Sequence, residues 1–167
     1  MTTLSFAIPG ECVPKGRPRH GRGRTYTPKR TADYERTVKV YASAAAHDAG
    51  VSWRRDESAA LDVVIVIVLP RPGRLMARSA PLGRVPSTTR PDVDNYVKAV
   101  LDGIQAAGVI SDDSQVYHMT ATKVHGAIIG NAARATDRPT EAPHVLVTIS
   151  DAGAMLGAVN EQEADNA

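Results

Sequence analysis

The sequence lacks the features that would mark a secreted or membrane protein. Its 167 residues include one cysteine, Cys12, which excludes an intramolecular disulfide and a zinc site built from several cysteines. No stretch approaches the roughly 18 apolar residues that a membrane-spanning helix needs. The N-terminus has neither the charged start nor the apolar run of a signal peptide. We therefore expect a cytoplasmic protein without a membrane partner.

Net charge is also small, at +2, but the charges are unevenly distributed. Residues 12–32 and 71–90 contain seven and five of the 20 lysines and arginines and no acidic residue. Five aspartates, in contrast, lie within residues 92–113. Basic segments around an acidic group are typical of polyanion binding around a cation site. The alternative is a pair of solvated loops whose charge serves solubility.

The hydrophobic pattern predicts one α/β domain of mixed α+β type over residues 1–150. We expect a central mixed β-sheet with two main helices packed on it. The apolar run at 61–69 predicts a central strand that is covered on both faces. The other predicted strands are 3–9, 25–27, 115–125 and 144–150, and the predicted helices are 31–48 and 94–107.

Three finer expectations follow from the same pattern. Thr31 is the expected N-cap of the first helix, whose buried stripe comprises Tyr34, Val38, Tyr41 and Ala45. The second helix should bury Val97, Val100, Leu101 and Ile104. Residues 70–90 are predicted to form a long basic loop without regular structure, and 151–167 a disordered acidic tail.

The segment 90–98 carries the clearest chemical signal. Asp92 and Asp94 are two positions apart, so an extended backbone points both carboxylates to one side. Lys98 follows Asp94 by one helical turn, on the polar face that also carries Asp102. Asp113 can join them only if the strand after it runs back beside this segment, or if a second chain contributes.

Three carboxylates with room for water suit a hard cation such as Mg²⁺, with Mn²⁺ as a substitute. A metal ion and a lysine beside it are suited to phosphodiester hydrolysis, because both neutralise charge at the phosphate. Structural alternatives exist for each residue. Asp94 is a good helix N-cap, Asp112 and Asp113 form a typical turn, and Lys98 with Asp102 is a typical surface ion pair.

The block RPDVDNYVKAVLDGI, followed by SDDSQV, resembles the RusA-type Holliday-junction resolvases of bacteria and phages. The resemblance runs from Arg90 to Val116 without a gap. It implies that Asp92, Asp94 and Asp113 bind Mg²⁺ and that Lys98 is needed for cleavage. It further implies a homodimer that makes paired nicks in four-way junctions during DNA recombination and repair. Asn95, Asp102 and Asp112 match the motif, with their roles open.

Phosphate contacts are expected from the basic segments, in particular from Lys15, Arg17, Arg19, Arg22, Arg24 and Arg90. Long loops leave the substrate open among junctions, forks, flaps and duplex DNA. Two other functions stay open at this point. One is a non-catalytic module that binds branched DNA, and the other is a metal-dependent phosphohydrolase of small nucleotides.

Overall fold

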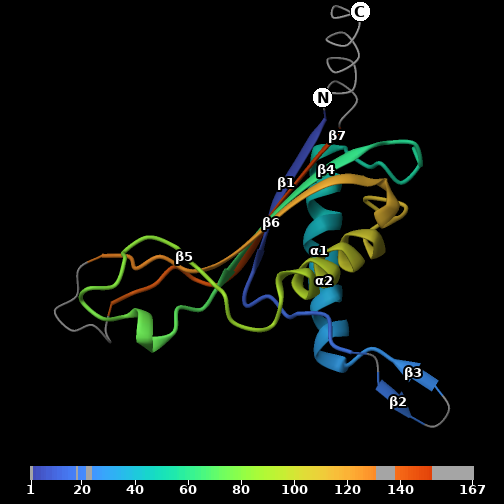
Figure 1. Cartoon of the computed structure of the whole chain (residues 1–167). Helices are drawn as coiled ribbons and strands as arrows, with labels where there is room; N and C mark the ends of the chain where they lie inside the picture. The colour runs from blue at the N-terminus through green and yellow to red at the C-terminus, as the bar shows by residue number, and fades with distance from the viewer. Residues whose placement is uncertain (1, 18, 22–23, 131–137, 152–167) are drawn as a thin grey trace, which may run out of the picture.

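A five-stranded mixed sheet with both helices on one face forms the domain (Figure 1). The computed structural model describes residues 2–17, 19–21, 24–130 and 138–151, with the backbone alone at 19–21 and 24–26. The strand order is β1-β7-β4-β6-β5, and β4 pairs in parallel with β6 and antiparallel with β7. These strands are β1 Thr3–Pro9, β4 Leu61–Leu69, β5 Val85–Pro86, β6 Val116–His125 and β7 His144–Asp151.

The predicted fold class is confirmed, and so is the central position of β4. The expectation that β4 is covered on both faces is wrong for the described elements. Leu61, Val63 and Ile65 are buried beneath the helices, while Val64 and Val66 on the opposite face are only half-buried. Both α1 and α2 lie on the same side of the sheet (Figure 1). The core is therefore a single layer between one sheet face and two helices.

The two helices are α1, Lys29–Ala49, and α2, Val93–Ala106. The predicted stripe of α2 is confirmed, since all four of its residues are buried. In α1 the stripe instead comprises Thr31, Tyr34, Val38 and Ala42, and Tyr41 is 38% exposed. Thr31 is not the N-cap, because the helix begins two residues earlier and the Thr31 hydroxyl accepts a hydrogen bond from the Gly16 amide.

Residues 70–90 are more ordered than their composition predicts. They contain a 3-10 turn, η1 Gly73–Leu75, and the strand β5. Arg71 is buried and donates hydrogen bonds to the backbone carbonyls of Leu75, Pro81, Gly83 and Gly126. The expectation of a structureless loop is therefore wrong, because one guanidinium supplies donors to carbonyls that no regular ladder satisfies. This segment and residues 126–130 and 138–143 form an arm that extends from the sheet (Figure 1).

An ion pair joins the two segments of the arm. The Arg84 guanidinium binds the Glu141 carboxylate in a bidentate manner, with Nε–Oε2 at 3.0 Å and Nη2–Oε1 at 2.5 Å. The hydrogen bond from Arg84 lowers the pKa of Glu141 to about 2. Glu141 Oε2 also accepts from the Ala127 amide at 3.0 Å. Arg84 is thus engaged within the arm.

Replacing Arg71 with methionine should destabilise the arm. Its loss leaves four carbonyls without their donor, so we expect the free energy of unfolding to fall by about 3 kcal/mol. Amide exchange in residues 71–86 should accelerate. The control is Arg74→Met, in the same segment, where Arg74 is exposed. Equal urea midpoints and exchange rates for the two variants would contradict this role of Arg71.

The two remaining strands form a hairpin apart from the main sheet. The hairpin pairs β2, Arg19–Gly21, with β3, Arg24–Tyr26, and overlaps the strand predicted at 25–27. Of the predicted tail, residues 152–167 lie outside the described part. Neither described helix is long and apolar enough to cross a membrane.

Candidate active site

The polar site begins at the start of α2. Asp92 occupies the N-cap position with an extended backbone (φ −69°, ψ 155°), but its side chain makes no capping hydrogen bond. Asp94 lies in the first turn, where negative charge is favoured by the helix dipole. The alternative in which Asp94 serves as the N-cap is therefore wrong by two positions. Both carboxylates are exposed and available to a ligand.

A groove of about 460 Å³ between α2 and β6 brings together three of the predicted site residues, Asp94, Lys98 and Asp113. Its apolar lining comes from the same helix and strand, from Val93, Val97, Leu101, Met119 and Ala121. The strand β6 does run back beside α2, as the sequence required for Asp113 to approach the helix. Asp113 itself opens a 3-10 turn, η2 Asp113–Gln115, just before that strand.

Asp92 borders a second cavity of about 390 Å³, together with Ser87 and Lys123. This cavity shares Val93 and Ala121 with the groove, so the two are neighbours. Asp92, Asp94 and Asp113 thus line two neighbouring cavities. They do not form a closed ligand set, since no group of three His, Cys, Asp or Glu side chains in the described ranges is close enough to hold a metal ion.

The chemistry of these donors nevertheless fits a hard divalent cation. Asp92, Asp94 and Asp113 offer only carboxylate oxygens, which Mg²⁺ prefers, and all three are exposed enough to leave room for water. Within the described residues, none of the three forms an ion pair, and neither does Lys98. A metal ion would therefore displace no resident cation.

Asp112 has a structural role next to this site. Its carboxylate accepts a hydrogen bond from the Ser114 amide at 2.9 Å, and this bond lowers the pKa of Asp112. The Gln115 side chain completes the capping box and donates to the carbonyls of Trp53 and Asp56 at 3.3 and 2.7 Å. Asp112 and Gln115 thus anchor the turn on which Asp113 sits.

Asp102 is engaged away from the groove. Lys15 binds both Asp102 and Glu35, the latter at 2.5 Å, and its amide donates to Asn95 O at 2.7 Å. Burial lowers the pKa of Lys15, but the hydrogen bonds to Asp102 and Glu35 outweigh burial and raise it. The surface pair of Lys98 with Asp102 is therefore not formed. Lys15 joins the loop after β1 to both helices.

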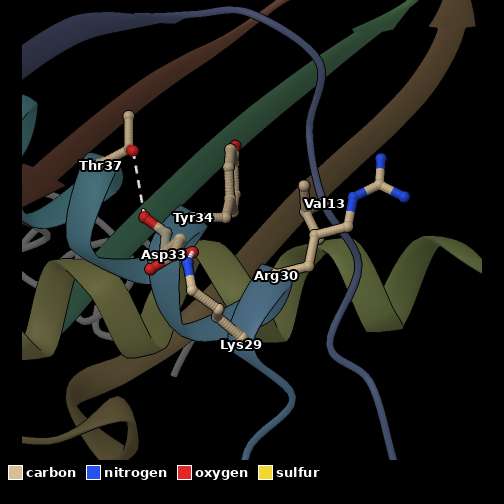
Figure 2. A pocket seen from close by; sticks show the side chains of 6 residues that line it. All are labelled: Val13, Lys29, Arg30, Asp33, Tyr34 and Thr37. Carbon is tan, nitrogen blue, oxygen red and sulfur yellow. Dashed lines mark hydrogen bonds and ion pairs between the residues drawn. The ribbon is translucent and has the colours of Figure 1, made fainter.

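The basic segment forms two further cavities near the start of α1. Figure 2 shows the first, of about 570 Å³, in which Lys29 turns toward Asp33 and Arg30 extends away from that pair. The second, of about 480 Å³, is lined by Arg17 and again by Arg30. Lys29 and Asp33 pair at 2.5 Å, whereas Arg17 and Arg30 have no ion-pair partner among the described side chains. These two arginines are free to contact a polyanion.

Of the other predicted DNA contacts, the structure describes the side chain of Arg90. Arg90 is exposed and lies two residues before Asp92. Arg19, Arg22 and Arg24 lie outside the described side chains.

Cys12 is buried, and burial raises its pKa to about 12, which agrees with a core residue and not a nucleophile.

Sequence reasoning missed Lys123. This residue comes from β6, and its ammonium donates to the carbonyls of Thr89 and Pro91, each at 2.6 Å. In the sequence Lys123 is one member of an alternating strand more than 30 positions from its acceptors. No local periodicity links it to the acidic segment, so no sequence signal was available.

Comparison with known proteins gives matches that cover most of the chain. The family described as endodeoxyribonuclease RusA matches residues 9–149, which include both cavities and both helices. A Bacillus subtilis (strain 168) protein, named uncharacterized protein YqaN, is 28% identical over 132 residues, covering 75% of this chain and 89% of that protein. The family match spans most of the chain, including every residue predicted for the metal site. The chain belongs to the RusA endodeoxyribonuclease family.

Proposed function

We propose that this endodeoxyribonuclease resolves four-way DNA junctions by Mg²⁺-dependent hydrolysis, with Asp92, Asp94 and Asp113 as the metal ligands. The observation that carries the proposal is the groove shared by Asp94, Lys98 and Asp113, next to the cavity of Asp92. Family membership supplies the reaction class, since its members cut branched DNA. Mn²⁺ is expected to substitute for Mg²⁺ because it also accepts oxygen ligands.

In this proposal each side chain of the groove has one task. Bound Mg²⁺ supplies charge neutralisation at the phosphate and helps to generate a nucleophile from water. Lys98 projects from α2 into the same groove and holds the scissile phosphate, where its charge is most useful as negative charge develops. Val97, Leu101 and Met119 form the apolar wall of the groove beside these charged groups.

Backbone phosphates on either side are held by arginines. Arg17 and Arg30 are the best placed in the described part, because each lines a cavity and lacks an ion-pair partner. Arg90 is exposed beside the acidic segment and is a third contact. Lys15 contributes less, since its ammonium is held by two carboxylates. Such contacts position DNA without selecting a sequence.

We also propose that the enzyme acts as a homodimer in recombination and repair. A four-way junction has two-fold symmetry, and two symmetric active sites are needed to cut two of its strands as a pair. An isologous dimer provides that arrangement. A single-site monomer would release nicked junctions, which migrate differently from paired products on a gel.

The test is cleavage of a synthetic four-way junction, a fork and a linear duplex in parallel, with Mg²⁺ or with EDTA. We expect paired nicks in the junction with Mg²⁺, no cutting with EDTA, and slower cutting of the duplex. Binding without cutting under every condition would favour a non-catalytic module. Hydrolysis of free nucleotides without junction cutting would favour a small-molecule phosphohydrolase.

A further inference from the structure

Lys123 holds the segment that carries Asp92 in place. Its ammonium donates to the carbonyls on either side of Arg90, those of Thr89 and Pro91, at 2.6 Å each. Hydrogen bonds from a charged donor are stronger than those between neutral groups. Within the described part of the chain, these are the two hydrogen bonds that tie residues 88–91 to another element. Together with the Ser87 amide, which donates to the Lys123 backbone carbonyl at 3.0 Å, these bonds tie the entry of α2 to β6.

The surroundings of Lys123 limit the positions that its ammonium can take. The residue lies on β6 opposite Ile67 of the central strand, so its backbone is fixed by the sheet. Its ammonium lies 5.8 Å from the centre of the Tyr96 ring, a favourable distance for a cation over an aromatic face. Tyr96 is buried on α2. Lys123 thus connects the rigid sheet, the start of α2 and residues 89–91.

The same side chain lines the cavity that Asp92 borders. Asp92 follows Pro91 directly, so a shift of the Pro91 carbonyl changes the direction of the Asp92 backbone and of its carboxylate. No acidic side chain of the described ranges pairs with Lys123. Two of its three N–H donors are used by carbonyls, which is the pattern of a residue that orders the backbone.

We propose that Lys123 is a positioning residue that aims the Asp92 carboxylate at the metal by fixing the Thr89 and Pro91 carbonyls. This inference rests on the proposed function, in which Asp92 is a metal ligand. It adds a residue that neither contacts the metal nor holds the scissile phosphate. Its effect should therefore appear as weaker metal binding and should be transmitted through Asp92.

The test measures Mn²⁺ binding to the protein without DNA, by the loss of the electron paramagnetic resonance signal of free Mn²⁺. Lys123→Met keeps the length of the stem and removes the donors, and we expect the Kd for Mn²⁺ to rise about tenfold, in proportion to weaker placement of one of three ligands. The Mg²⁺ concentration for half-maximal nicking should rise in parallel, with most of the rate recovered at saturating Mg²⁺. Junction binding in EDTA should not change. The matched control is Lys39→Met, an exposed lysine of α1.

A double variant separates positioning from a general structural effect. If Lys123 acts through Asp92, then Lys123→Met should weaken Mn²⁺ binding no further in an Asp92→Asn background. Lys123→Arg keeps charged donors, so its Kd for Mn²⁺ should lie within about threefold of the wild-type value. This variant also tests the inference if the methionine variant does not fold. Additive losses, unchanged Mn²⁺ affinity, or weaker junction binding in EDTA would each overturn the inference. Wild type that binds no Mn²⁺ would refute the metal site itself, a distinct result.

Discussion

Asp113→Asn should lower the rate of junction nicking by at least about 1,000-fold while leaving junction binding intact or slightly stronger. The amide keeps the size of the side chain but removes the charge that a divalent cation requires, and metal catalysis contributes several kcal/mol to the reaction. Asp92→Asn should behave in the same way. Each substitution also removes negative charge from the surface that we propose faces DNA, which favours binding.

The measurement is single-turnover nicking of a synthetic four-way junction, with binding followed by gel shift in EDTA. Asp48→Asn is the control, because Asp48 is an exposed carboxylate at the end of α1, outside both cavities. A nicking rate within tenfold of wild type for either site variant would exclude that aspartate as a metal ligand. Loss of nicking in the Asp48 variant would indicate a general effect of charge.

Lys98→Ala should reduce nicking by about 100- to 1,000-fold with junction affinity changed by less than about threefold. Lys98 lies in the groove with Asp94 and Asp113 and has no ion-pair partner among the described residues, so its charge is available to the phosphate. Removing one preorganised charged donor from a reacting centre has an effect of this size. A single cation among many contributes little to binding of a polyanion.

Rates at saturating enzyme and affinities from gel shifts separate these two effects. Lys39→Ala, which removes an exposed lysine from α1, should change neither quantity. If affinity and rate fell together for Lys98→Ala, the residue would belong to DNA binding and not to the chemical step. If neither fell, the groove would not be the reaction centre.

Sequence patterns predicted the regular core well, because its signals are local. The run at 61–69 and the stripe of α2 depend only on residues that are neighbours along the chain, and both are confirmed. Expectations failed where residues far apart in the sequence determine the local structure. Thr31 lies inside α1, since the helix begins at Lys29 after its N-cap Pro28. Its hydroxyl accepts a hydrogen bond from the distant Gly16 amide instead of capping the helix. The burial of the second face of β4 depends on which elements pack against it, and the hydrophobic pattern of the strand does not reveal this.

The arm illustrates the same limit. Residues 70–90 are rich in proline and glycine, and nothing in their sequence indicates that Arg71 is buried. Its acceptors include Gly126, which is 55 positions away. An arginine that satisfies backbone carbonyls has the same sequence signature as one that binds DNA. Structure is therefore required to divide the basic residues between internal and external partners.

The candidate site was predictable in part for a similar reason. Helical spacing alone puts Asp94 and Lys98 on one face, and the groove agrees. The approach of Asp113 depends on the course of β6, and the role of Lys123 depends on residues 89–91 lying beside that strand. Asp102 shares the same helical face but binds Lys15, a partner that spacing could not identify.

The account depends on one divalent cation shared by three aspartates. A crystal of the protein soaked in Mn²⁺, with anomalous scattering recorded near the manganese edge, tests this most directly. The account predicts a peak within about 2.5 Å of oxygens from Asp92, Asp94 and Asp113, which is the range for oxygen ligands of such cations. Manganese bound elsewhere, or no ordered manganese at millimolar concentration while the carboxylates remain apart in every copy, would contradict it.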